Sequence, residues 1–197
     1  MIRSGPLRRI EAMALPGWIK PQLTRLVDQA PDGPDWLHEI KFDGYRIHAR
    51  LDRGEVRLLT RTGLDWTHKY PAIAAAVSAL PARQAHLDGE LCGVRPDGTT
   101  SFSLIQNASD TGDSGALVFF LFDLLHLDGE AIAPMPVTER KERLRALLSD
   151  VGSPLHFSDH QILRGPAFYD HACTLKVEGI VSKRSMRPTL PAIAAYG

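Results

Sequence analysis

The sequence predicts an α+β fold in which most strands pair antiparallel. Apolar and polar residues alternate through residues 36–61, with a turn signal in between, as in a β-hairpin. Residues 70–80 and 138–150 instead carry apolar side chains at helical spacing. Residues 116–125 form an almost unbroken apolar run, which predicts a strand buried on both faces of a central sheet. Strands and helices mixed in this order, without repeats, are typical of an α+β domain.

The chain opens with a segment that prolines keep extended. Pro6, Pro16 and Pro21 interrupt residues 1–30, which predicts an arm laid over a domain rather than a helix. Within this arm, residues 1–15 are the candidate for disorder.

Five further strands are predicted from alternation and turn residues. Residues 36–41, 45–52 and 55–61 follow one another, and Asp52-Arg53-Gly54 supplies the hairpin turn between the second and the third. Residues 86–94 and 179–183 show the same strand pattern.

Four helices are predicted between these strands. Residues 70–80 have Pro71 in the first turn and Pro81 after the end, which are the positions where a helix tolerates proline. Shorter helices are predicted at 101–108 and 166–177. Residues 138–150 should begin with Thr138 as a capped start and be amphipathic, with leucines on one side and charged residues on the other.

Composition excludes several classes of protein. The 197 residues suffice for one or two domains, and 23 basic residues balance 23 acidic ones, so any contact with DNA must come from a local patch. Cys92 and Cys173 are too few for a disulfide scaffold, and both are expected to be reduced and buried. Without an apolar run of membrane-spanning length or a secretory signal, the expected location is the cytoplasm, at the nucleoid when the protein is on DNA.

The stretch Glu-Ile-Lys-Phe-Asp-Gly-Tyr-Arg at residues 39–46 concentrates the most chemistry. A strand ending here would carry Glu39 and Lys41 on one face, and Gly44 would permit a turn or a close approach of backbones. A lysine that attacks phosphorus must first lose its proton, which partial burial and nearby cations favour. Taken alone, the stretch fits a solvated surface hairpin better.

Three later motifs change this interpretation. They are Leu-Asp-Gly-Glu-Leu at 87–91, Phe-Asp-Leu-Leu-His-Leu-Asp-Gly at 122–129 and Glu-Gly-Ile-Val-Ser-Lys at 178–183. In this order and spacing, the four motifs resemble those of the covalent nucleotidyltransferases, specifically the ATP-dependent DNA ligases of the bacterial Ligase D type. The resemblance covers residues 16–184, and it implies the ligase nucleotidyltransferase fold, with a pair of sheets flanking an ATP cleft.

The resemblance also implies the chemistry of individual residues. Lys41 is the nucleophile that attacks the α-phosphate of ATP, holds AMP as a phosphoramidate and expels pyrophosphate. Asp43, Glu90 and Glu178 correspond to carboxylates that bind Mg²⁺ or orient the ribose, and oxygen ligands suit that ion. The remaining implied ATP contacts are Arg46 and Arg61 toward ribose or phosphate, Phe122 stacked on adenine with Phe120 as the alternative, Glu39 at the adenine edge, and Lys183 at the phosphates.

Residues 185–197 depart from the family pattern. No lysine follows Lys183, whereas these ligases continue into a lysine-x-lysine motif and an oligonucleotide-binding (OB-fold) domain, so a divergent tail is expected. One hypothesis is an adenylation module that acts on nicked double-stranded DNA in repair or recombination, weakly alone or with a separate OB-fold or end-joining partner. The alternative is an ATP-binding remnant that does not ligate. A relative of mRNA-capping enzymes or RNA ligases is a third hypothesis, which the wording of 87–91 and 122–129 disfavours.

Overall fold

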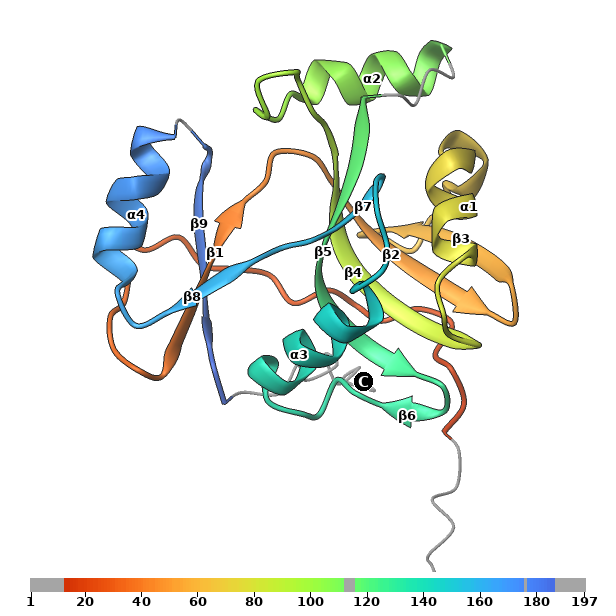
Figure 1. Ribbon diagram of the computed structural model, residues 1–197, viewed down its shortest axis with the longest axis horizontal. Coiled ribbons are helices and arrows are strands. Elements are labelled where there is room, and N and C mark those ends of the chain that lie inside the picture. The colour runs from red at the N-terminus through yellow and green to blue at the C-terminus, as the bar shows by residue number, and fades with distance from the viewer. Residues whose placement is uncertain (1–12, 112–115, 176, 187–197) are drawn as a thin grey trace, which may run out of the picture.

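The computed structural model describes residues 13–111, 116–175 and 177–186, and its elements form two sheets (Figure 1). The larger sheet has the order β3-β2-β4-β5-β6, with all neighbours antiparallel. A further short strand, β7, pairs parallel to β5. The strands are β2 (Tyr45–Asp52), β3 (Glu55–Thr60), β4 (Gln84–Gly93), β5 (Leu117–Leu127), β6 (Glu130–Ala131) and β7 (Leu155–Phe157).

The smaller sheet has three strands in the order β8-β1-β9. β1 (Trp36–Lys41) lies in the middle, antiparallel to both β8 (His160–Ile162) and β9 (Gly179–Arg184). The pairing of β1 with β9 brings the first motif beside the last one, because Lys41 is opposite Gly179.

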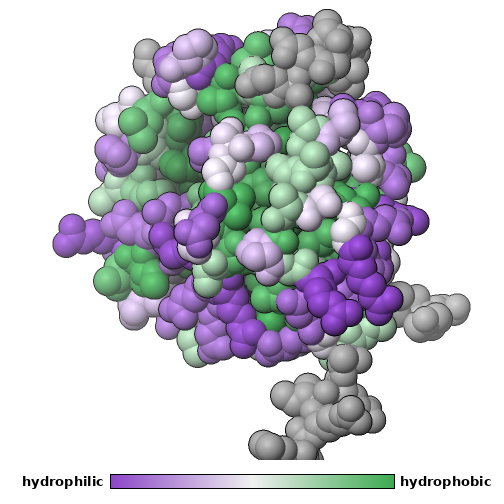
Figure 2. All heavy atoms as spheres, turned by 45° about the vertical axis from the view of Figure 1, so that its right-hand side comes forward, coloured by the Kyte–Doolittle hydropathy of each residue, from purple (hydrophilic) through white to green (hydrophobic). Residues whose placement is uncertain are grey.

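Helices cover both sheets (Figure 1). α1 (Pro71–Ser78) packs on β2 and β3, α2 (Phe102–Thr111) packs on β4 and β5, and α4 (Gly165–Thr174) packs on the small sheet. α3 (Val137–Leu147) packs on β5, and a 3₁₀ turn at Thr67–Lys69 precedes α1. The main core lies between the large sheet and its helices, and includes Ile47, Leu58, Ile73, Leu87, Ile105, Phe119, Leu121 and Leu144. On the face drawn in Figure 2, hydrophilic side chains gather along the lower edge, as expected for a polar surface around such a core.

Most predicted elements are confirmed, with ends displaced by a few residues. Residues 55–60, 71–78, 84–93 and 165–174 are the observed counterparts of predictions at 55–61, 70–80, 86–94 and 166–177. β6, β7 and β8 were not predicted, because two or three residues are too few to show a period.

The prediction that residues 116–125 are buried on both faces is only partly right. Leu117, Phe119 and Leu121 are buried in the core, whereas the alternate residues on this part of β5 are partly exposed. One of them, Phe120, stacks on Phe42, which follows β1. The second face of β5 is therefore turned toward the small sheet rather than covered by helices.

Three smaller predictions need correction. α3 starts at Val137 after Pro136 with no side-chain cap, because Thr138 lies inside the first turn rather than before it. Cys92 is buried as predicted, but Cys173 is exposed on α4. The disorder predicted for residues 1–15 stays a prediction, because residues 1–12 lie outside the described part of the chain; of the others, Leu15 is buried and the Met13 amide donates to the carbonyl of Gly129.

The arm is otherwise extended, as predicted from its prolines. Strand β2 holds it in place, since Arg50 donates to the carbonyl of Pro16 at 3.0 Å. Across the described residues, no helix combines the length and the apolar character needed to cross a membrane.

Candidate functional site

Lys41 stands at the end of β1, where the two sheets face each other. Its ammonium forms an ion pair with the carboxylate of Glu178, which immediately precedes Gly179 and β9. Both side chains are 43% exposed, so the amine is reachable from solvent. Glu178 and Lys41 are 137 residues apart in the sequence, and antiparallel pairing of β1 with β9 is what joins them.

Gly44 lets the chain after Lys41 run against β4. A Cβ atom at residue 44 would lie 2.2 Å from the carbonyl oxygen of Leu91 and 2.8 Å from Sγ of Cys92. Real Cβ contacts are not that short, so the backbone approaches too closely for any side chain. The prediction that this glycine permits a close approach is confirmed.

Glu39 is buried between two lysines. Lys141 of α3 forms an ion pair with Oε1 of Glu39, and Lys183 of β9 forms one with Oε2. Burial alone would raise the pKa of Glu39, but the charges of Lys183 and Lys141 outweigh it and lower that pKa. Glu39 is therefore an ionised acceptor in a place with little water.

Arg46 is fixed by a bidentate contact with Asp88 of β4. Its Nη2 and Nε donate to the two carboxylate oxygens at 2.7 and 3.1 Å, and Nη1 donates to the carbonyl of Gln22 at 2.8 Å. Burial would lower the pKa of Arg46, but the hydrogen bond with Asp88 outweighs it and raises that pKa. The guanidinium lies over the ring of Phe122, 5.4 Å from its centre, which places a permanent cation beside this ring.

The two candidate adenine-stacking rings have different neighbours. The Phe120 ring is stacked on that of Phe42, with centroids 4.1 Å apart and planes within 6°. The Phe122 ring instead meets cations, since Nζ of Lys183 lies 4.7 Å from its centre. Phe120 thus already has an aromatic partner, whereas Phe122 adjoins the Glu39–Lys183 pair.

Of the three predicted metal-binding acids, Glu178 pairs with Lys41, Asp43 follows β1, and Glu90 lies on β4. Burial raises the pKa of Glu90 to about 7. The charges of Asp88 and Glu178 raise this pKa further, whereas those of Arg46 and Lys41 lower it. Burial also raises the pKa of the Cys92 thiol, and the charges of Glu90, Asp43 and Glu178 add to it. All three predicted metal-binding acids therefore lie near Cys92. Within the described ranges, no three His, Cys, Asp or Glu side chains form a ready ligand set for a metal ion, so a divalent cation at these acids stays a prediction.

Some predicted residues are not drawn into the site. Arg61 is exposed after the end of β3 and forms no ion pair among the described residues. His156 and His160, to which the sequence assigns no metal, lie on the short strands β7 and β8.

Two buried cations of α3 were missed by the sequence interpretation, and one of them, Lys141, contacts the site through Glu39. Lys141 and Arg140 were placed on the charged outer side of the helix at 138–150, but both are buried. Arg140 binds Asp123 of β5 through Nε at 2.7 Å and Nη2 at 2.9 Å. Their spacing was the available signal, because 137, 140, 141, 144 and 147 form one helical stripe.

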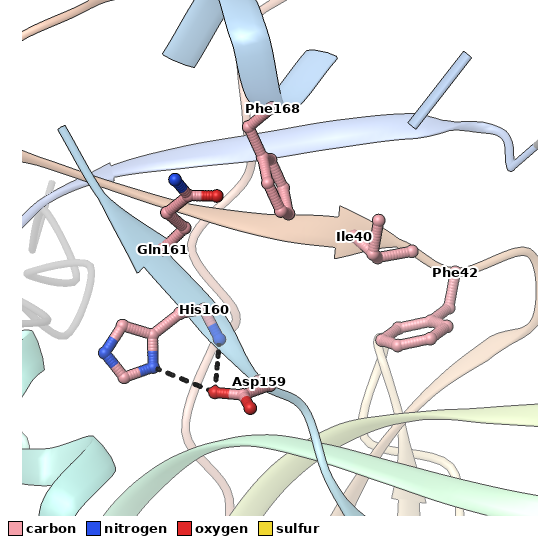
Figure 3. A pocket seen from close by; sticks show the side chains of 6 residues that line it. All are labelled: Ile40, Phe42, Asp159, His160, Gln161 and Phe168. Atoms are coloured by element: carbon pink, nitrogen blue, oxygen red, sulfur yellow. Dashed lines mark hydrogen bonds and ion pairs between the residues drawn. The ribbon is translucent and has the colours of Figure 1, made fainter. Parts of the chain in front are cut away.

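A separate pocket of about 410 Å³ lies beside the site, lined by Ile40, Phe42, Asp159, His160, Gln161 and Phe168 (Figure 3). Ile40 alternates with Glu39 and Lys41 along β1, so it points to the other face of the strand. Phe168 reaches the pocket from α4. The pocket adjoins the cluster around Lys41 nevertheless, because His160 is the strand partner of Glu39 and Phe42 directly follows Lys41.

Comparison with known proteins agrees with this arrangement. Residues 21–192 match the family model described as ATP dependent DNA ligase domain. The chain is 39% identical over 171 residues to the multifunctional non-homologous end joining protein LigD of Pseudomonas aeruginosa, covering 86% of this chain and 20% of that protein. A DNA ligase of Pyrobaculum calidifontis is 30% identical over 158 residues, covering 74% of this chain and 27% of that one.

Among solved structures, mycobacterial DNA ligase D complexed with ATP and MES superposes with a TM-score of 0.76 at 29% identity, covering 88% of this chain and 56% of that one. The ligase domain from M. tuberculosis LigD gives a TM-score of 0.70 at 30% identity, with 82% and 51% covered. The chain thus spans about a fifth of the LigD protein it matches and about half of these solved chains. Since the family model covers most of the sequence and both comparisons agree with it, the chain belongs to the ATP-dependent DNA ligase domain family.

Proposed function

We propose that the chain forms the adenylation part of a DNA ligase, in which Lys41 becomes covalently linked to AMP. The observation that carries this proposal is the contact between four separated motifs beside one half-exposed lysine. Lys41 is paired with Glu178, Arg46 binds Asp88, and the ring of Phe122 adjoins both Arg46 and Lys183.

In the proposed step, neutral Nζ of Lys41 attacks the α-phosphorus of ATP. An N–P bond forms, and the bond from that phosphorus to the bridging oxygen breaks, so pyrophosphate leaves with the electron pair. The proton that Nζ gives up has an acceptor in Glu178, whose Oε1 already accepts a hydrogen bond from this amine. Arg46 and Lys183 supply cations for the phosphate charge.

Mg²⁺ is the metal proposed for this site. Glu90 and Glu178, with Asp43 at the rim, would hold it through oxygen atoms and water. When bound, the ion would neutralise negative charge that develops on the phosphates.

The adenine subsite is proposed at Phe122 and Glu39. The ring would stack on the base, and the ionised carboxylate would accept from its amino group, while Arg46 would lie toward the ribose. Arg61, exposed after the end of β3, is the second arginine proposed to contact ribose or phosphate.

Nicked double-stranded DNA is the proposed second substrate. This follows from the family and from relatives named as DNA ligases and as an end-joining protein, which points to repair of strand breaks. Because the net charge of the chain is zero, we expect its own DNA binding to be weak. The expected Kd is about 10⁻⁴–10⁻⁶ M, as for non-specific binding at physiological salt. A separate OB-fold or end-joining partner would strengthen it.

Labelling with radioactive ATP and Mg²⁺, followed by denaturing electrophoresis, tests the proposal. We expect an acid-labile AMP adduct on the wild-type chain and none on Lys41→Ala. Lys20→Ala is the matched control, because Lys20 is an exposed lysine of the arm, and its adduct should equal that of the wild type.

Persistence of the label in Lys41→Ala would contradict the assignment of the nucleophile. Binding of ATP without any adduct would favour an ATP-binding remnant instead. Sealing of a singly nicked duplex, measured in parallel, reports whether the adduct is passed on to DNA.

A further inference from the structure

Lys141 is a buried cation that none of the four motifs contains. Its side chain is 0% exposed, and its ammonium pairs with Oε1 of Glu39. The same ammonium donates to the carbonyl of Ser158 at 2.8 Å and toward that of Phe122 at 3.4 Å, and it lies 4.6 Å from the centre of the Phe157 ring. An ammonium has three donors, so all of them are used inside the protein. Lys141 is therefore held in place by three acceptors, the carboxylate of Glu39 and the carbonyls of Ser158 and Phe122.

Lys183 holds the other oxygen of Glu39 in a different way. Its side chain is 25% exposed, and the contacts of its ammonium are Oε2 of Glu39 and the face of the Phe122 ring. Lys183 thus occupies the face of Phe122 on which adenine would stack. It also occupies the Glu39 oxygen to which the amino group of adenine would donate. A flexible lysine stem can swing away from such a place toward phosphate.

The charges explain why both lysines are needed. If Lys183 withdraws, Lys141 still neutralises the buried carboxylate through Oε1 and leaves Oε2 free as an acceptor. Without Lys141, Glu39 would either retain Lys183 or take up a proton, because an unpaired buried carboxylate is costly. A protonated carboxyl group can donate to the oxygen of guanine as well as accept from the amino group of adenine. The selectivity of the site for adenine over guanine would then be lower.

We propose that Lys141 is a positioning residue that keeps Glu39 an ionised acceptor for the adenine amino group while Lys183 exchanges from Glu39 to the phosphates. This inference rests on the proposed function and adds to it the residue that sets base selectivity from outside the motifs.

The test measures equilibrium binding of the α,β-methylene analogues of ATP and GTP, which cannot release pyrophosphate, to the full chain. For Lys141→Met, we expect the preference for the ATP analogue to fall about tenfold or more, since the group that recognises the base is no longer held ionised. In the Glu39→Gln background, Lys141→Met should change the preference by less than about twofold, because its partner has lost its charge.

Lys141→Gln covers the case in which the methionine variant does not fold. It keeps a donor for Glu39 and for the carbonyls but removes the charge, and we expect the same loss of preference. Arg140→Met is the matched control, since Arg140 is the neighbouring buried cation on α3 and pairs with Asp123 rather than Glu39. It should lower the melting temperature and leave the ratio of the two affinities as in the wild type.

Two kinds of failure are distinguishable. If the wild type prefers the ATP analogue but the Lys141 variants keep that preference, or lose it equally with and without the carboxylate of Glu39, this inference is overturned and the proposed function stands. If the wild type binds neither analogue and forms no adduct, the proposed function fails and the inference fails with it.

Discussion

The ring of Phe122 has Arg46 and Lys183 as neighbours, whereas that of Phe120 already has Phe42 as a stacking partner. For Phe122→Ala, we expect ATP affinity to fall about tenfold to a hundredfold, because stacking of a base on an aromatic ring is worth roughly 1–3 kcal/mol. Phe120→Ala is the control; it should lower stability more than affinity. Isothermal titration with the ATP analogue distinguishes the two rings, and a larger loss of affinity in Phe120→Ala would reverse their roles.

The carboxyl group of Glu90 makes stability depend on pH in a predictable direction. Its pKa is raised from 4.5 to about 7 by burial, so between these values the folded protein holds a proton that the unfolded chain has released. Stability therefore falls as pH rises through this window. At pH 8, Glu90→Gln should be more stable than the wild type by on the order of 3 kcal/mol at most in the free energy of unfolding, and should melt at a higher temperature. Below pH 4.5 the two proteins should differ little. A difference that stays constant across a pH series of melting curves would contradict this.

Single residues also show how far the sequence could predict the site. Lys41, Glu178 and Lys183 were placed by motif, and the pairing of β1 with β9 brings Glu178 to Lys41 and Lys183 to Glu39. Lys141 was not predicted, because a lysine in a charged helix is normally solvated and only its buried partner, Glu39, changes that expectation. A buried pair between residues 102 apart leaves no local pattern in the sequence.

At the scale of elements, the turn between β1 and β2 depends on the absence of a side chain. Gly44→Ala would place Cβ 2.2 Å from the carbonyl oxygen of Leu91, and a backbone atom cannot move aside as a side chain end can. We expect a loss of about 1–3 kcal/mol or more in the free energy of unfolding, together with a slower adduct formation. Gly152→Ala is the control, since nothing lies within 4 Å of its added Cβ. Equal stability of the two variants in urea denaturation would contradict the clash.

The long elements were predictable because their periods are regular over eight residues or more. β2 illustrates this with the predicted bounds, and the ends of α1 and β4 differ from the predictions by one or two residues. The partly exposed face of β5 was not predictable, since Phe120 and Phe122 are apolar but contact Phe42 and Lys183 instead of the core. An apolar ring on a half-covered strand looks in the sequence like a buried one.

At the scale of the whole molecule, α3 connects the two sheets (Figure 1). Arg140 ties it to β5 of the large sheet through Asp123, and Lys141 ties it to β1 of the small sheet through Glu39. Asp123→Asn should cost about 3–5 kcal/mol, because it leaves a buried guanidinium without its charged partner. Glu130→Gln breaks the exposed ion pair between Glu130 of β6 and Arg143 of the same helix, and should cost less than about 1 kcal/mol. Chemical denaturation of both variants measures the contrast, and similar losses would mean that the buried contact does not hold the sheets together.

The unequal exposure of the two cysteines has a practical consequence. Cys92 is buried beside the carboxylates of the site with its pKa raised by burial, whereas Cys173 is exposed on α4 over the small sheet. A maleimide fluorophore added in limited amount should therefore attach to Cys173 alone, because the thiolate is the reactive form. The natural sequence thus carries a single attachment point for a reporter dye, on the part of the molecule that bears Lys41 and Lys183.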